Sequence, residues 1–314
     1  MRLPTAPDGG RGCSALARYT GEQIAGTAGR KGGWLLIEHN GPWRHPALES
    51  PGLDSGVVSQ LAERIDGRDI KPQLIKRPGY SERTPVDGPS RAYYVHASRS
   101  RPWARRVDFH DLAELLAHDV TAVEHPEPPS FGTAVDHTLY LVCTHAKKDP
   151  CCAVLGRPVA AALGRARAEV WETTHVGGDR FAANLVTLPQ GVYFGRLDPE
   201  SAARTVAAFE QGLVPPENYR GRCTDSPPAQ AAEAALRTRL GSPVGVNALT
   251  HLCEEETEAG VRVTLAHGDG LYSVEVETVE GLECPATCAA LSPTRPVHHR
   301  VREIHEDLHS GSQV

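Results

Sequence analysis

The chain has 314 residues, 40% of them hydrophobic and 23% charged, a balance that excludes a disordered chain and can build cores for two or three domains. Its net charge of −6 lacks the basic excess of a dedicated nucleic-acid binder. Apolar runs are short, whereas a membrane-spanning helix needs roughly 20 apolar residues. The N-terminal residues lack the apolar core of a secretory signal, so we expect a cytoplasmic protein whose eight cysteines serve metal or redox chemistry.

The first half of the chain alternates strand and helix patterns. Residues 1–12 are polar and rich in Gly and Pro, so we expect a flexible tail, followed by an α/β domain over residues 13–125. Apolar side chains spaced four residues apart predict a helix over 53–65, with Asp54 or Ser55 as its N-cap. The other predicted segments are strands at 34–37, 72–76 and 92–96, a short helix at 111–116 and a linker over 119–134.

Residues 135–225 repeat this order. Their predicted segments are a strand at 138–143, a loop at 144–152, a helix at 156–166, a strand at 169–173, a hairpin of 185–188 with 191–195, and a helix at 199–211. Any α/β chain shows some alternation, but the matching order favours a duplicated thioredoxin-like sandwich, with helices on both faces of a mixed sheet.

The last part of the chain, residues 226–314, is predicted as a smaller α+β region. An alanine-rich helix is expected over 229–240, followed by two hairpin strands at 260–266 and 271–278. The residues after Ser310 form a polar tail by composition.

Two segments that each follow a predicted strand carry most of the reactive side chains. The first, CTHAKKDPCC, contains Cys143, Cys151 and Cys152, and the second, THVGGDRF, contains His175 and Asp179 around a Gly-Gly pair. Loops at strand ends are where α/β folds place sites, and glycines allow the backbone to bend tightly. We therefore expect these side chains to converge at one edge of the sheet.

Three motifs together resemble the sucrase/ferredoxin-like family of thioredoxin-like ferredoxins. They are C-T-H-x3-D-x2-C beginning at Cys143, H-x-G-G-x-R-F-A-x-N beginning at His175, and L-P-x-G-x-Y-x-G-R beginning at Leu188. The resemblance covers about residues 13–225 and is weak beyond them.

The resemblance implies a [2Fe–2S] cluster with Cys143 and Cys152 on one iron and His175 on the other. A second histidine of an H-x3-H motif maps to Asp179, where this chain departs from the pattern. Either the Asp179 carboxylate is the fourth ligand, or Cys151 completes the site and Asp179 lies behind it. A carboxylate makes the centre one charge more negative than an imidazole, which lowers the expected potential.

We therefore interpret the chain as a one-electron carrier rather than a catalyst, with a reductase and an acceptor protein as unidentified redox partners and no nucleic-acid or membrane partner. Two alternatives remain open from the residues: a metal-free thiol-redox protein and a structural zinc module. Cys284 and Cys288 have four-residue ligand spacing, but we expect spare thiols or a disulfide there. For Cys13, Cys223 and Cys253 we expect buried thiols.

Overall fold

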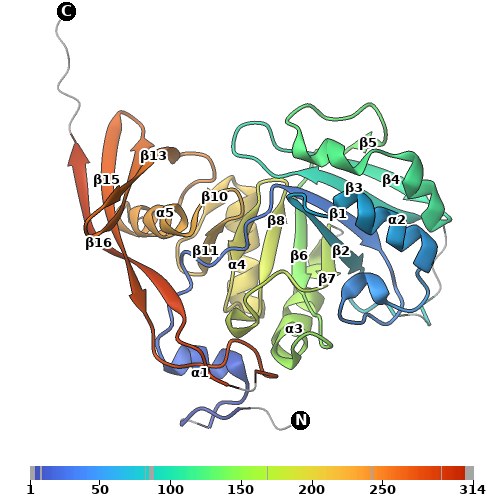
Figure 1. Ribbon diagram of the computed structural model, residues 1–314, viewed down its shortest axis with the longest axis horizontal. Coiled ribbons are helices and arrows are strands. Elements are labelled where there is room, and N and C mark those ends of the chain that lie inside the picture. The colour runs from blue at the N-terminus through green and yellow to red at the C-terminus, as the bar shows by residue number, and fades with distance from the viewer. Residues whose placement is uncertain are drawn as a thin grey trace, which may run out of the picture.

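The computed structural model describes residues 4–7, 9–81, 83–84, 88–167, 169–241, 243–290 and 292–307. Among these residues, ten strands form one mixed sheet and four more form a separate antiparallel sheet (Figure 1). The molecule is therefore a mixed α/β protein, as expected, with fewer helices than strands. The predicted tail after Ser310 lies outside the described residues.

The large sheet has the order β11-β9-β8-β6-β7-β2-β1-β3-β4-β5. Its strands are β1 (Gly33–Glu38), β2 (Ile70–Lys76), β3 (Ser90–His96), β4 (Trp103–Phe109), β5 (Thr133–Ala134), β6 (Leu139–Cys143), β7 (Val170–Thr173), β8 (Leu185–Leu188), β9 (Val192–Phe194) and β11 (Tyr219–Arg222). Most of the strands predicted from apolar runs are present, while β4, β11 and the short β5, which lies in the predicted linker, were not predicted.

The two halves of this sheet have the same strand order and the same directions. In the first half β1 is parallel to β2 and antiparallel to β3, and β3 is antiparallel to β4. In the second half β6 is parallel to β7 and antiparallel to β8, and β8 is antiparallel to β9. The halves join where β2 pairs antiparallel with β7, so one continuous sheet runs through both.

In the described part of the chain, five α-helices accompany the strands: α1 (Cys13–Tyr19), α2 (Ser55–Ile65), α3 (Pro150–Ala166), α4 (Pro199–Glu210) and α5 (Pro227–Arg239). The Asp54 side chain caps α2 by accepting from Val57 N, which confirms the predicted start. Helix α3 begins within the segment that we expected to be a loop, because Asp149 caps it and Pro150 fits its first turn. Cys151 and Cys152 therefore lie in the first turn of a helix.

Apolar side chains fill both faces of the large sheet. Alternate residues of β6 point to opposite faces, so Tyr140 and Val142 pack with Leu163 of α3, while Leu141 and Cys143 pack with Trp171. The predicted linker contains a 3-10 helix, η3 (Val120–Glu124), with two buried valines.

Part of the predicted N-terminal tail is packed against the rest of its own segment. Thr5 forms a β-bridge with Arg11, and the Ala6 side chain is buried.

The C-terminal sheet contains β13 (Thr250–Thr257), β14 (Gly260–His267), β15 (Gly270–Glu280) and β16 (Val297–Asp307), in that order. Helix α5 packs on its apolar side, where Leu236 belongs to one buried cluster with Val263, Leu265 and Val274. A short two-stranded ladder pairs β10 (Leu213–Val214), which precedes β11 of the large sheet in sequence, with β12 (Val244–Gly245), which follows α5. The β14–β15 hairpin was predicted; β13 and β16 were not.

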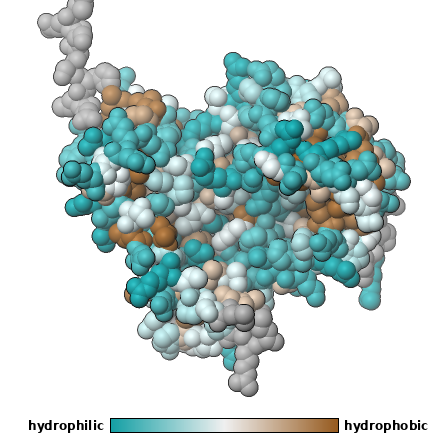
Figure 2. Space-filling view, viewed as in Figure 1, coloured by the Kyte–Doolittle hydropathy of each residue, from teal (hydrophilic) through white to brown (hydrophobic). Residues whose placement is uncertain are grey.

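The view in Figure 2 shows a mostly hydrophilic face, broken by small apolar patches near α2 and over the C-terminal sheet. Among the described helices, none combines the length and apolar character needed to cross a bilayer.

Candidate metal centre

The two segments that carry reactive side chains meet beside the end of β6. Cys143 is the last residue of β6, Cys152 lies in the first turn of α3, and His175 follows β7. Their sulfur atoms and one imidazole nitrogen all lie within 4.8 Å of one another. Strand β6 is parallel to β7, so both strands end at the same edge of the sheet and the loops that follow them converge.

Asp179 joins this group. Its Oδ1 accepts a hydrogen bond from the Cys152 thiol at 3.1 Å and lies 2.8 Å from Nδ1 of His175. Among the described residues, that nitrogen has no partner that meets hydrogen-bond geometry. Two sulfurs, a nitrogen and a carboxylate oxygen therefore lie close together.

The electrostatics of the group favour the ionised forms of Cys143 and Asp179 and the protonated forms of Cys152 and His175. Contact with the Cys152 thiol, and then with His175, lowers the pKa of Cys143 despite its burial. The same Cys143 contact and burial raise the pKa of Cys152. Burial would raise the pKa of Asp179, but His175 outweighs it and the pKa is lowered. Burial would lower the pKa of His175, but contacts with Asp179 and Cys143 outweigh it and raise the pKa to about 9, so metal binding would displace protons from Cys152 and His175. A thiolate and a carboxylate are the protonation states in which these side chains ligate metals.

Glycines allow the close approach. A Cβ on Gly156 of α3 would lie 2.1 Å from the carbonyl oxygen of Cys143, so only glycine lets α3 lie against the end of β6. Gly177 and Gly178 have φ of 101° and 74°, the left-handed region that favours glycine. The predicted tight bend between His175 and Asp179 is present.

The N-terminal half holds the His175 loop in place. From β2, Gln73 Nε2 donates to the His175 carbonyl at 2.9 Å, and Lys71 Nζ donates to the Val176 carbonyl at 3.0 Å. His145 accepts from His175 N at 3.3 Å through Nδ1, so its Nε2 carries the proton and donates to the Arg44 carbonyl at 2.8 Å. Gln73 and Lys71 gave no signal in the sequence, because they lie about one hundred residues from the loop that they contact.

Arg220 is a further buried residue that the sequence did not suggest. Its Nη1 donates to the Gly177 carbonyl at 3.0 Å and to Oδ1 of Asn184 at 2.8 Å. Asn184 in turn donates to the Gly178 carbonyl at 2.9 Å. Burial lowers the pKa of Arg220 to about 10, so it stays a cation at neutral pH. Arg180, in the same loop, pairs with Glu22 at 2.5 Å.

Cys151 points away from Cys152, since adjacent helical residues are rotated by about 100°. Its sulfur lies 3.3 Å from that of Cys288, in a second group of buried side chains that also contains Cys13 and Asp149. The structure thus separates Cys151 from the Cys143 group, for which the sequence analysis gave it as the alternative fourth ligand.

Cys13 and Cys223 are buried as expected. Cys253 is exposed, so the expectation of a buried thiol at that position was wrong.

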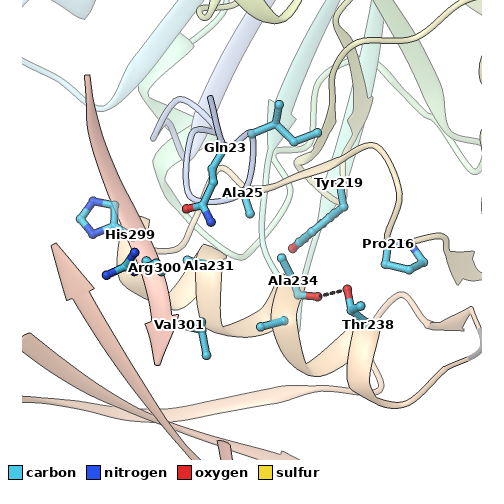
Figure 3. Close-up of a pocket in the computed structure, with 12 residues that line it drawn as sticks. Gln23, Ala25, Pro216, Tyr219, Ala231, Ala234, Thr238, His299, Arg300 and Val301 are labelled. Carbon is cyan, nitrogen blue, oxygen red and sulfur yellow. Dashed lines mark hydrogen bonds between the residues drawn. The ribbon is translucent and has the colours of Figure 1, made fainter. Parts of the chain in front are cut away.

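The cavity in Figure 3 lies elsewhere. It has a volume of about 310 Å³ and is lined by α5, β16 and residues 23–25. None of the candidate ligands lines it, so we place no part of the metal centre there.

Comparison with known proteins agrees with these motifs. A family model described as "Sucrase/ferredoxin-like" matches residues 24–221. The chain is 30% identical over 147 residues to "Altered inheritance of mitochondria protein 32" of Meyerozyma guilliermondii, covering 37% of this chain and 52% of that protein. It is 26% identical over 152 residues to the protein of that name from Eremothecium gossypii, covering 41% and 49%. The chain thus spans about half the length of these relatives, and no solved structure matches it.

Proposed function

Because this chain belongs to the sucrase/ferredoxin-like family, we propose that it is a [2Fe–2S] protein that carries single electrons. In this proposal Cys143 and Cys152 bind one iron, and His175 and Asp179 bind the other. The convergence of two sulfurs, an imidazole nitrogen and a carboxylate oxygen at one sheet edge carries the proposal. These donors match the thiolate and imidazole ligands of Rieske-type centres, with an oxygen in place of one imidazole.

The surrounding protein supports this role. A bound cluster would supply reversible one-electron chemistry. Cys143, Cys152 and Asp179 are buried, while 26% of the His175 side chain is exposed, so the imidazole is the donor that an electron-transfer partner could approach. The buried cation of Arg220 lies over the ring of Phe181, next to the loop, where it would favour added negative charge.

The same proposal includes a thioredoxin-like fold for each half of the sheet. Its support is the order β7-β6-β8-β9, repeated as β2-β1-β3-β4, with the first two strands parallel and joined by a helix. We also propose a cytoplasmic protein that exchanges electrons with a reductase and an acceptor protein. In its support, the eight cysteines are free thiols, as expected in a reducing compartment.

A structural zinc site is the second candidate. The donor atoms of Cys143, Cys152 and His175 lie within 4.8 Å of one another, a spacing that one tetrahedral zinc ion also satisfies. The metal-free thiol-redox alternative relies on the contact between the Cys143 and Cys152 thiols.

Anaerobic purification tests the proposal. The protein should be red-brown and contain about two irons and two sulfides per chain, and Cys143→Ser should lose both. Cys253→Ser is the matched control, because that thiol is exposed and should leave the iron content unchanged. A colourless protein with zinc at Cys143 would favour the second candidate. A colourless, metal-free protein with titratable thiols would favour the thiol-redox alternative.

A further inference from the structure

A second group of thiols brings together three distant parts of the chain. Cys13 is the first residue of α1, Cys151 lies in the first turn of α3, and Cys288 belongs to the segment between β15 and β16. Figure 1 shows that segment, in red-brown, passing beside the blue helix α1. The Cys288 sulfur is 3.3 Å from that of Cys151 and 3.6 Å from that of Cys13.

A buried carboxylate completes the group. Asp149 is fully buried, and its Oδ2 lies 3.6 Å from the Cys13 sulfur. Its two oxygens also accept from the backbone, Oδ1 from Cys151 N at 2.8 Å and Oδ2 from Cys288 N at 2.6 Å. One ligand atom from each of the four side chains lies within 4.8 Å of all the others.

The backbone is shaped around these sulfurs. Gly12 has φ of 95°, and a Cβ there would lie 2.4 Å from the Cys151 sulfur and 3.4 Å from the Cys288 sulfur. Cys13 N donates to the Cys288 sulfur at 3.3 Å, the kind of N–H···S contact that orients a thiolate ligand. The Gly12 backbone therefore lies directly against two of these sulfurs, where a side chain would not fit.

We propose that Cys13, Cys151, Cys288 and Asp149 form a tetrahedral Zn²⁺ site, separate from the Cys143 group. Zinc binds thiolate sulfur at about 2.3 Å, which places the sulfurs of one ion roughly 3.7 Å apart, close to the contacts observed here. Three thiols in mutual contact suit one ion better than a disulfide, which would join two and leave the third buried and unpaired. Binding releases the thiol protons and leaves a net charge of −2 on Zn(Cys)3(Asp).

The position of the site gives it a structural role. It would link α1 and the segment between β15 and β16 to the first turn of α3, and so hold two segments that are distant in sequence against the helix that packs on the large sheet. Cys151 precedes Cys152, so the ion would also fix the turn that presents Cys152 to the first group. This last point rests on the proposed function, whereas zinc binding itself does not.

Zinc content and zinc X-ray absorption test the site. Wild-type protein purified with reductant and zinc should hold about one zinc per chain, with three sulfur neighbours and one oxygen. Cys288→Ser should lose that zinc. Cys284→Ser, the same change in the same segment, should retain it, because Cys284 lies outside the group.

The Cys143→Ser variant distinguishes the proposed cluster from the proposed zinc site, because it changes a ligand of the cluster and leaves every zinc ligand in place. It should lose its iron yet keep zinc with the three-sulfur shell. The site is disproved if wild-type protein takes up no zinc, if its thiols form a Cys151–Cys288 disulfide under the same reducing conditions, or if the zinc shows two sulfurs and a nitrogen and disappears in Cys143→Ser.

Discussion

Asp179 is the one position of the first group where this chain departs from the histidine expected there. In the proposed centre it would supply a negative oxygen where a neutral imidazole would otherwise bind. Net charge is a main determinant of the potential of an iron–sulfur centre, so Asp179→His, which makes the centre one charge less negative, should raise the reduction potential. A redox titration followed by electron paramagnetic resonance measures this change.

The same substitution on the surface provides the control. Asp136 is almost fully exposed, so solvent screens its charge and Asp136→His should leave the potential unchanged. An unchanged or lower potential in Asp179→His would show that hydrogen bonding or burial, rather than ligand charge, sets the potential.

The packing of α3 on β6 positions two of the proposed ligands at once. Gly156 lies where a Cβ would be 2.1 Å from the Cys143 carbonyl, and that oxygen belongs to backbone that cannot move freely. Gly156→Ala should therefore push α3 from the strand, destabilise the protein by about 1–3 kcal/mol and reduce its iron content. Urea unfolding and iron analysis measure the two effects.

Gly56 of α2 offers a matched helix position. The nearest atom to an added Cβ there is Oδ1 of Asp54, at 3.3 Å and at the end of a flexible side chain. Gly56→Ala should leave the iron content unchanged and the stability equal or higher by up to about 1 kcal/mol. Equal loss of iron in both variants would contradict the packing argument.

Elements with strong local signals were predictable from the sequence. The four-residue apolar spacing and the Asp54 cap were enough for α2, and a buried apolar run was enough for β1. Strand β16 escaped prediction because its register shifts opposite Glu275 and Val276, so its inward residues Val301 and Ile304 are three apart instead of two. In the sequence of β16, charged residues predominate and the apolar residues do not alternate at every second position as they do in a regular strand.

The convergence of Cys143, Cys152 and His175 was predictable because parallel strands bring their following loops to one edge. The second group was not, because Cys13 and Cys288 are 275 residues apart and meet only through tertiary packing. Both cysteines were considered from the sequence, but no local sequence pattern indicates which buried thiols contact one another in the folded chain. Cys284 and Cys288 are free and do not share a ligand group, in agreement with the expectation of spare thiols despite their four-residue spacing.

Buried charges connect the C-terminal region to the large sheet. Arg99, in the loop after β3, pairs with Asp225 and with Glu233 of α5. Glu233 also pairs with Arg237 at 2.8 Å, and both side chains are fully buried. Removing one partner of such a network leaves buried charge without compensation, so Glu233→Gln should destabilise the protein by about 3–5 kcal/mol.

The exposed pair Glu200–Arg204 provides the control for urea unfolding. It also joins residues four apart on a helix, but solvent screens it, so Glu200→Gln should change the free energy of unfolding by less than about 0.5 kcal/mol. If the two variants lose equal stability, the buried network does not hold α5 to the sheet.

The cost of Glu233→Gln should also depend on pH. Burial opposes ionisation of Glu233, but Arg99 and Arg237 outweigh it and lower its pKa from 4.5 to about 2. A lowered pKa in the folded state stabilises the protein above the unfolded value, and that stabilisation is lost as pH falls through the folded value. The stability difference between wild type and Glu233→Gln should therefore be largest above about pH 4.5 and shrink toward pH 2. A difference that stays constant across this window would mean that Glu233 contributes through shape and not through charge.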